Sequence, residues 1–211
     1  MYLSAGKARL LNIFFREPWG EFHQRELARR AKVPIQNAHQ YLGAFVEAGW
    51  LIRRDVSRMS FFRPQWESGE LLKAFELFEL EHREAFLKRN KSIARLLVKA
   101  TGTLVHASQW HIQLVMLFGS VARGMWTSKS DIDVLAVASH PWSPMEKAFR
   151  EAKTATQSVL ELNPVFTDIE SAIAGFRERR TFHQEVWGDR VVLYNEGLFW
   201  RIVREGLRSA G

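Results

Sequence analysis

The chain has no cysteine among its 211 residues. This absence excludes disulfides, thiolate zinc sites and cysteine nucleophiles, and it fits a reducing compartment. No apolar run approaches the roughly 18–20 residues that a membrane-spanning helix needs. The N-terminal residues lack the small-residue cleavage site of a secretory signal. We therefore expect a cytoplasmic protein without a membrane partner.

Several catalytic signatures are also missing. The seven histidines are scattered, and no pair has the spacing of a helical zinc motif. The chain contains neither a glycine-rich P-loop nor a Gly-x-Ser-x-Gly elbow. Zinc hydrolases, P-loop NTPases and serine hydrolases of that type are thus disfavoured.

Positive charge is present in excess and is unevenly distributed. The formal net charge is +7. Residues 1–65 alone carry eleven Lys or Arg against five Asp or Glu, a net charge of +6. Such asymmetry indicates a polyanionic partner for this segment.

The same 65 residues predict three helices followed by a hairpin. Apolar residues at helical spacing mark a first helix that ends before Pro18. We expect the second helix at Gln24–Ala31 and the third at residues 35–48. Residues 50–52 and 60–62 flank a polar tip, as the two strands of a hairpin do.

This order of elements, with the segment RELARRAKVPIQNAHQYLGAFVEAGWLIRR, resembles the winged helix-turn-helix domains of prokaryotic transcription regulators. The resemblance implies that residues 1–65 bind double-stranded DNA. Side-chain amides would pair with adenine edges, and wing cations would contact phosphates. The implied DNA-binding residues are Gln36, Asn37, His39 and Gln40 on the third helix and Arg53, Arg54 and Arg58 on the wing. Basic three-helix units also serve in protein docking or dimerisation, and that alternative stays open.

Residues 66–107 predict two helices, at about 70–88 and 91–106, which connect the N-terminal and C-terminal domains. The first helix carries an aromatic stripe that is expected in the core or at a homodimer contact.

The segment 114–137 carries the strongest functional pattern. An apolar run, residues 114–118, breaks at Gly119-Ser120, and Asp131 and Asp133 precede a second apolar run. Side chains two apart on a strand point to the same face, so the two carboxylates would project together. Paired carboxylates hold Mg²⁺, and a Gly-Ser turn at a helix start offers backbone N–H groups to phosphate. The pattern predicts nucleotidyl transfer.

Gly119-Ser120, Arg123-Gly124 and Ser130-Asp131-Ile132-Asp133 together resemble the signature of the DNA polymerase β superfamily of nucleotidyltransferases, closest to its minimal prokaryotic branch. The resemblance implies a domain over residues 108–211 that uses Mg²⁺ or Mn²⁺. It would transfer a nucleoside monophosphate from a nucleoside triphosphate, such as ATP, to an acceptor hydroxyl. Acceptors within the family include proteins, small antibiotics and RNA ends, and some members are antitoxins that modify a helical toxin. A helical toxin partner therefore stays open for this chain.

The resemblance assigns catalysis and metal binding to Asp131 and Asp133. The residues expected to bind nucleotide phosphates are Gly119, Ser120, Arg123, Lys129 and Ser130. For Arg123, a salt bridge between its helix and the sheet is an equally open alternative, and Lys129 is as consistent with a solvated loop charge.

The third carboxylate of the family has no evident counterpart. The position that aligns with it is Asn163, whose amide cannot take a proton at neutral pH. Glu161 lies two residues earlier on the same face and is a candidate substitute, whereas Asp168 is expected to cap the following helix. A slow enzyme, one that relies on the substrate's own nucleophile, and a non-catalytic DNA-binding regulator that only binds nucleotide all stay open.

The expected fold class is α/β (α+β), with a mixed sheet in the C-terminal domain and helices on one side of it. The predicted domains are 1–65, 66–107 and 108–211. The predicted strands of the last domain are 112–118, 132–139, 163–167 and 190–194, and its helices are 143–160, 168–186 and one from about 196.

Overall fold

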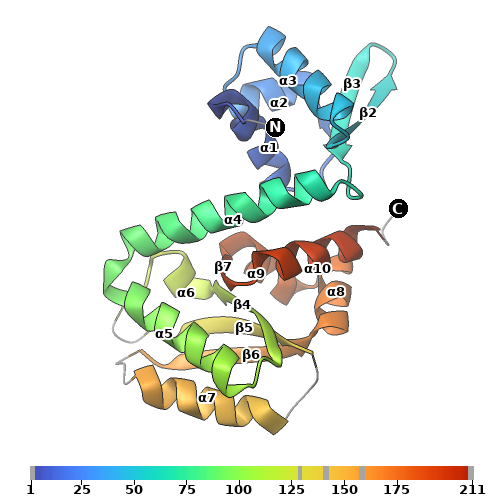
Figure 1. Cartoon of the computed structure of the whole chain (residues 1–211). Coiled ribbons are helices and arrows are strands. Elements are labelled where there is room, and N and C mark those ends of the chain that lie inside the picture. Colours follow the sequence, from blue (N-terminus) through green and yellow to red (C-terminus); the bar gives the residue numbers. More distant parts are fainter. Residues whose placement is uncertain (1–2, 128–129, 140–142, 157–159, 209–211) are drawn as a thin grey trace. The chain divides into compact units, whose positions relative to one another are not determined.

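The computed structural model describes residues 3–127, 130–139, 143–156 and 160–208. The chain forms two compact units, Met1–Phe78 and Glu79–Gly211, and each has its own sheet (Figure 1). The boundary falls inside helix α4 (Gly69–Arg89). Among the described residues, no helix is both long and apolar enough to cross a membrane.

The first unit packs three helices against a small antiparallel sheet with strand order β1-β3-β2. Its elements are α1 (Ala5–Arg16), β1 (Phe22–His23), α2 (Gln24–Ala31), α3 (Ile35–Glu47), β2 (Leu51–Val56) and β3 (Met59–Pro64). The three predicted helices are thus confirmed. Leu10, Phe14, Leu27, Leu42 and Phe45 are all completely buried and form the centre of this core.

The hairpin of the first unit is longer than expected. The polar residues predicted to form its tip continue the two strands as far as the pair Val56 and Met59, so only two residues make the turn. Ser57 adopts a left-handed conformation there, with φ +56°, as tight hairpin turns require. The two-residue strand β1 was not predicted, because two residues carry no readable alternation.

The second unit is built on a four-stranded mixed sheet with strand order β6-β5-β4-β7. Only the β5–β6 pair is parallel. Its elements after α4 are α5 (Lys91–Ala107), β4 (Ile112–Phe118), α6 (Gly119–Ala122), β5 (Ile132–Ala138), α7 (Ser143–Thr156), β6 (Leu162–Asp168), α8 (Ile169–Arg177), α9 (Thr181–Asp189), β7 (Val191–Tyr194) and α10 (Glu196–Arg208). The four predicted strands are confirmed to within a few residues.

Helices cover both faces of this sheet, so the expectation of helices on one side was wrong. Val115 and Leu117 of β4 pack in one core cluster with Leu97 of α5 and residues of α7. Leu114 and Met116 point to the opposite face and are equally buried, and there α8, α9 and α10 contact the strands. The continuous apolar runs of β4 and β5 are typical of strands that are buried on both faces.

The helix predicted over residues 168–186 is broken in two, a second correction. α8 ends at Arg177 and α9 begins at Thr181, with Arg179 in the left-handed region at φ +51°. The N–H of Arg180 donates to the carbonyl of Gly175, closing the helix end in the usual way. The break was missed because the apolar spacing continues across it. The predicted cap is confirmed, since Asp168 accepts a hydrogen bond from the Ser171 N–H at 2.7 Å.

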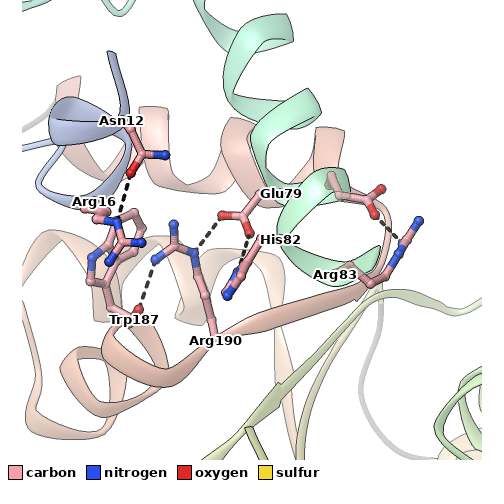
Figure 2. Close-up of polar contacts among 8 residues, drawn as sticks. Asn12, Arg16, Glu79, His82, Arg83, Trp187 and Arg190 are labelled. Atoms are coloured by element: carbon pink, nitrogen blue, oxygen red, sulfur yellow. Dashed lines mark hydrogen bonds and ion pairs between the residues drawn. The ribbon is translucent and has the colours of Figure 1, made fainter. Parts of the chain in front are cut away.

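A buried ion pair ties α4 to the start of β7 (Figure 2). The Nε of Arg190 donates to Oε1 of Glu79 at 2.7 Å, and its Nη1 donates to the Trp187 carbonyl at 2.9 Å. Glu79 is fully buried, and its Oε2 makes no hydrogen bond with the described residues. Burial raises the pKa of the Glu79 carboxyl, and the Arg190 guanidinium opposes that rise.

The variant Arg190→Ala should lower the free energy of unfolding by about 3–5 kcal/mol, because among the described residues it leaves the buried Glu79 carboxylate only the His82 imidazole, 4.0 Å from its Oε2, as an ionic partner. Urea unfolding at pH 7, followed by tryptophan fluorescence, measures the change. The matched control is Arg201→Ala on the exposed face of α10, where a shift of about 0.5 kcal/mol or less is expected. Equal urea midpoints for the two variants would contradict the prediction.

Candidate active site at the β4–α6 turn

The chain passes from β4 into α6 at Gly119. Gly119 has φ +74°, a conformation that only glycine adopts without strain. A Cβ atom at this position would lie 2.6 Å from Oδ2 of Asp133. Glycine is therefore favoured here for its backbone conformation, and any larger residue would displace the Asp133 carboxylate.

Asp131 and Asp133 flank Ile132 at the start of β5. Ile132 is buried in the core cluster shared with α5 and α7, so Asp133, the next residue of the strand, points the other way. Asp131 precedes β5 and is exposed, whereas Asp133 is half-buried and pairs in register with Phe118 of β4. The two carboxylates therefore start β5 beside the turn that contains Gly119.

Asn163 lies directly beside Asp133 on the neighbouring parallel strand. The two residues are partners in the β5–β6 register, and Nδ2 of Asn163 donates to Oδ1 of Asp133 at 2.9 Å. A neutral amide thus holds one oxygen of Asp133, while the other faces Gly119. The sequence identified Asn163 as the aligned position, but only the strand register places it in contact with Asp133.

Glu161, the candidate substitute for the missing carboxylate, has a different partner. Its Oε1 accepts an ion-paired hydrogen bond from Nζ of Lys153 on α7 at 3.3 Å. Within the described part of the chain, no three His, Cys, Asp or Glu side chains gather closely enough to hold a metal ion. Glu161 therefore does not complete a three-carboxylate set with Asp131 and Asp133.

The other predicted phosphate-binding residues are distributed around the same turn. Ser120 follows Gly119 in α6 and is half-buried. Ser130 precedes Asp131, and its Oγ accepts a hydrogen bond from the Thr127 N–H at 2.9 Å. Arg123 forms an ion pair with Asp189 at the end of α9, so its salt bridge runs to a helix and not, as the alternative had it, to the sheet. Lys129 lies outside the described residues.

Asp189 and Phe182 of α9 were not anticipated from the sequence. Asp189 holds Arg123, and the ring of Phe182 meets the ring of Phe118 edge-on with centroids 5.5 Å apart. Phe118 is the last residue of β4, directly before Gly119. Both contacts join segments more than 60 residues apart, so no local sequence pattern predicts them.

These placements bring together the turn at Gly119 and two carboxylates at one end of β4 and β5 in a mixed sheet. Residues 104–186 match the family model of the nucleotidyltransferase domain. Searches of curated proteins and of solved structures gave no match. The nucleotidyltransferase match spans β4, α6, β5 and β6, the elements that carry the site, and it supports nucleotidyl transfer as the general chemistry of this domain.

The donor set of the nucleotidyltransferase domain fits a metal ion that is shared with a substrate. Mg²⁺ prefers octahedral oxygen coordination and is usually held by one or two carboxylates together with substrate phosphates and water. Asp131 and Asp133 are oxygen donors of this type. Two carboxylates are too few for a site made of protein alone, so bound nucleotide would have to supply further oxygen ligands.

The residues predicted to bind DNA all lie in the first unit. Gln36, Asn37, His39 and Gln40 are exposed on α3, as expected from the helical pattern. Two of the three wing arginines have acidic partners: Arg53 pairs with Asp55, and Arg54 pairs with Glu21. The Arg54 guanidinium lowers the pKa of the Glu21 carboxyl. Among the described residues, Arg58 in the hairpin turn is in no ion pair.

The variant Gly119→Ala should displace the Asp133 carboxylate and force a strained backbone, costing about 1–3 kcal/mol of stability. The matched control is Gly102→Ala in α5, where an added Cβ meets no atom within 4 Å and φ is not positive. That change should be neutral or stabilising by up to about 1 kcal/mol. Thermal unfolding of both variants measures the difference, and equal destabilisation would contradict the close contact at Gly119.

Proposed function

We propose that residues 108–211 catalyse transfer of a nucleoside monophosphate from a nucleoside triphosphate, such as ATP, to an acceptor hydroxyl with Mg²⁺ or Mn²⁺. The observation that carries this proposal is the apposition of Gly119 and Asp133. It joins a turn able to approach phosphate closely with a carboxylate that starts the neighbouring strand. The family match over residues 104–186 supports the same chemistry.

Residues at the Gly119–Ser120 turn and beside it would have separate physical roles in this reaction. Gly119 permits phosphate oxygens to approach the backbone, and Ser120 adds a hydroxyl and an N–H. Asp131 and Asp133 would bind the metal ion, which would neutralise negative charge on the phosphates and orient the leaving pyrophosphate. The Asp189 carboxylate fixes Arg123 one helical turn beyond Ser120 and offsets its charge, so nucleotide phosphates would compete with Asp189 for the guanidinium.

The acceptor oxygen would attack the α-phosphorus, the bond to the bridging oxygen would break, and pyrophosphate would leave. The acceptor's proton would pass to water, because the Asn163 amide cannot accept it at neutral pH. We therefore expect slow transfer unless the acceptor is itself a good nucleophile.

The hydrogen bond from Asn163 to Asp133 favours a second candidate function. An amide in place of a carboxylate removes one negative charge and a base from the site while it keeps Asp133 in position. On this alternative, the domain binds nucleotide or a partner with little or no catalysis and serves a DNA-binding regulator or antitoxin. A helical toxin protein and a homodimer partner belong to this alternative, and the cytoplasm is the proposed location of both forms.

The proposed partner of the first unit is double-stranded DNA. Its order of three helices and a terminal hairpin supports a winged helix-turn-helix, with α3 as the recognition helix. The exposed amides of Gln36, Asn37 and Gln40 suit base-edge contacts in a major groove. Because Arg53 and Arg54 already have acidic partners, Arg58 at the hairpin turn is the strongest candidate for a phosphate contact on the wing.

The transfer reaction is tested by incubating the purified protein with α-labelled ATP, GTP, CTP or UTP, Mg²⁺ or Mn²⁺, and host lysate. Label should reach a lysate component with the native chain and be lost with Asp131→Asn/Asp133→Asn. The variant Asn163→Asp restores a carboxylate beside Asp133 and should speed transfer by about 10²-fold, the typical contribution of a general base.

The control for this substitution is Asn12→Asp on α1, which makes the same chemical change in the first unit and should leave the transfer rate unaltered. If the native chain bound nucleotide in a metal-dependent way but transferred no label, and the double aspartate variant lost this binding, the nucleotide-binding regulator would be supported instead of the enzyme. Absence of both transfer and nucleotide binding would contradict the site.

DNA binding is tested by selecting duplexes from a random library and measuring the affinity of the selected site. The variant Gln36→Ala should weaken discrimination between bases by about 1–3 kcal/mol. Arg58→Ala should weaken binding to all duplex sequences alike. It should also reduce the slope of log affinity against log salt by the value for about one phosphate contact. Lys73→Ala on α4, whose ammonium pairs with Glu76, is the control. Failure to select any duplex would favour a docking or dimerisation role.

A further inference from the structure

A long stretch of the second unit carries positive charge and no acid. Between Glu84 and Asp131 the sequence contains neither Asp nor Glu. This stretch forms the end of α4, all of α5 and β4, and the turn at α6. Its cations are Lys88, Arg89, Lys91, Arg95, Lys99, Arg123 and Lys129.

The five cations nearest the α4–α5 corner, from Lys88 to Lys99, are all exposed. Among the residues that the structure describes, none of the five forms an ion pair with a carboxylate. Other cations of the second unit do so: Arg83 pairs with Glu196, and Lys153 with Glu161. The positive charge at this corner is therefore not neutralised by the protein and is available to a ligand.

Three of these cations form a stripe along the outer face of α5. Lys91, Arg95 and Lys99 are four residues apart, so their side chains lie one above another at steps of about 6 Å. Gly102 and His106 continue the same line, and both are exposed. A row of evenly spaced cations suits an extended chain of phosphates better than a single small anion.

The stripe ends at an exposed aromatic ring. Trp110 is 63% exposed and meets the His106 ring edge-on, with centroids 6.5 Å apart. Its backbone is left-handed at φ +66°, as is that of Gln109 at φ +52°, an uncommon conformation for a bulky residue. The N–H of Trp110 donates to the carbonyl of Val105, which fixes this turn. An exposed, fixed indole offers a flat surface on which an unpaired base can stack.

The direction of α5 relates the stripe to the candidate active site. Only residues 108–111 separate the end of α5 from the start of β4, and the two elements pack together. The helix therefore runs back along the strand, and its Lys91 end lies toward the end of β4 that leads into Gly119. In Figure 1 the start of α5 and the short helix α6 lie on the same side of the second unit.

We propose that the outer face of α5 binds single-stranded nucleic acid, with Lys91, Arg95 and Lys99 on phosphates and Trp110 stacked on a base. α5 covers the face of the sheet that buries Ile132, opposite to the face toward which Asp133 points, so this surface would bind a strand independently of the proposed nucleotidyl transfer. A single strand fits better than a duplex because a base must leave its stack to reach Trp110. The site is separate from the proposed duplex-binding surface of residues 1–65.

Binding is measured by fluorescence anisotropy with labelled RNA and DNA strands of about 12 nucleotides, within the range that such grooves cover. The full chain is used without nucleotide or metal, and excess unlabelled duplex DNA occupies residues 1–65. The test variants are Lys91→Ala/Arg95→Ala/Lys99→Ala and Trp110→Ala. The charge-matched control is Arg150→Ala/Arg177→Ala/Arg201→Ala, which removes three exposed cations from other helices of the same unit. Circular dichroism confirms that each variant is folded.

The triple stripe variant should lower the slope of log affinity against log salt by about 2, the value for three lost contacts to a single strand. Trp110→Ala should weaken binding by about fivefold or more. The control variant should bind as the native chain does. The ratio of RNA to DNA affinity identifies which strand is preferred.

Equal binding by the stripe variant and the control would overturn the proposal. Binding of anionic lipid vesicles or polyglutamate as tightly as the strands, with Trp110→Ala unaffected, would overturn it in favour of a membrane or an acidic protein. Failure of the transfer reaction is distinguishable: Asp131→Asn/Asp133→Asn should still bind the strand. If the native chain did not bind the strands but still transferred label to a lysate protein, the α5 site would be contradicted and the proposed transfer would stand.

Discussion

The contact between Gly119 and Asp133 governs the arrangement of the second unit around its candidate site. The antiparallel register places Phe118 opposite Asp133, so the chain must leave β4 at the point where the carboxylate begins β5. A positive φ at Gly119 lets it turn away at once, and the missing Cβ leaves room for Oδ2. The same register, continued to β6, brings the Asn163 amide to the other oxygen. One strand alignment therefore decides the turn, the carboxylate position and the identity of its neighbour.

Helix α9 and the start of β7 support this turn from outside the motif. Asp189 holds Arg123, and the adjacent residue, Arg190, enters the buried pair with Glu79 of α4. Two consecutive residues thus join the turn at Gly119 and the middle of α4 at one junction. Buried ion pairs contribute little net stability but are costly to break, so this junction specifies where β7 and α9 lie. A change at Arg190 is expected to reach the turn through its neighbour, although neither residue is part of the recognised motif.

Charge is organised differently in the two units. In the first unit, acids on neighbouring strands and loops neutralise part of the wing, since Arg53 and Arg54 are paired, and exposed amides dominate α3. In the second unit, the cations of α5 stand without acids and end at an exposed indole. Amide side chains suit hydrogen bonds to base edges in a duplex groove. A row of cations beside an aromatic ring suits the flexible phosphate backbone of a single strand and one stacked base. The two surfaces suit different forms of nucleic acid.

The sequence by itself determined the local elements and the motif. Period-two and period-3.6 patterns located the helices and strands, and the spacing of Asp131 and Asp133 placed both carboxylates at the start of the second apolar run. Long-range packing decided the covering of both sheet faces, the Asn163–Asp133 contact, the Arg123–Asp189 pair and the Arg190–Glu79 pair. The residues of these three contacts lie 30 to 111 positions apart in the chain. Local periodicity contains no information about such pairings, because side-chain spacing records only which face is buried, not what covers it.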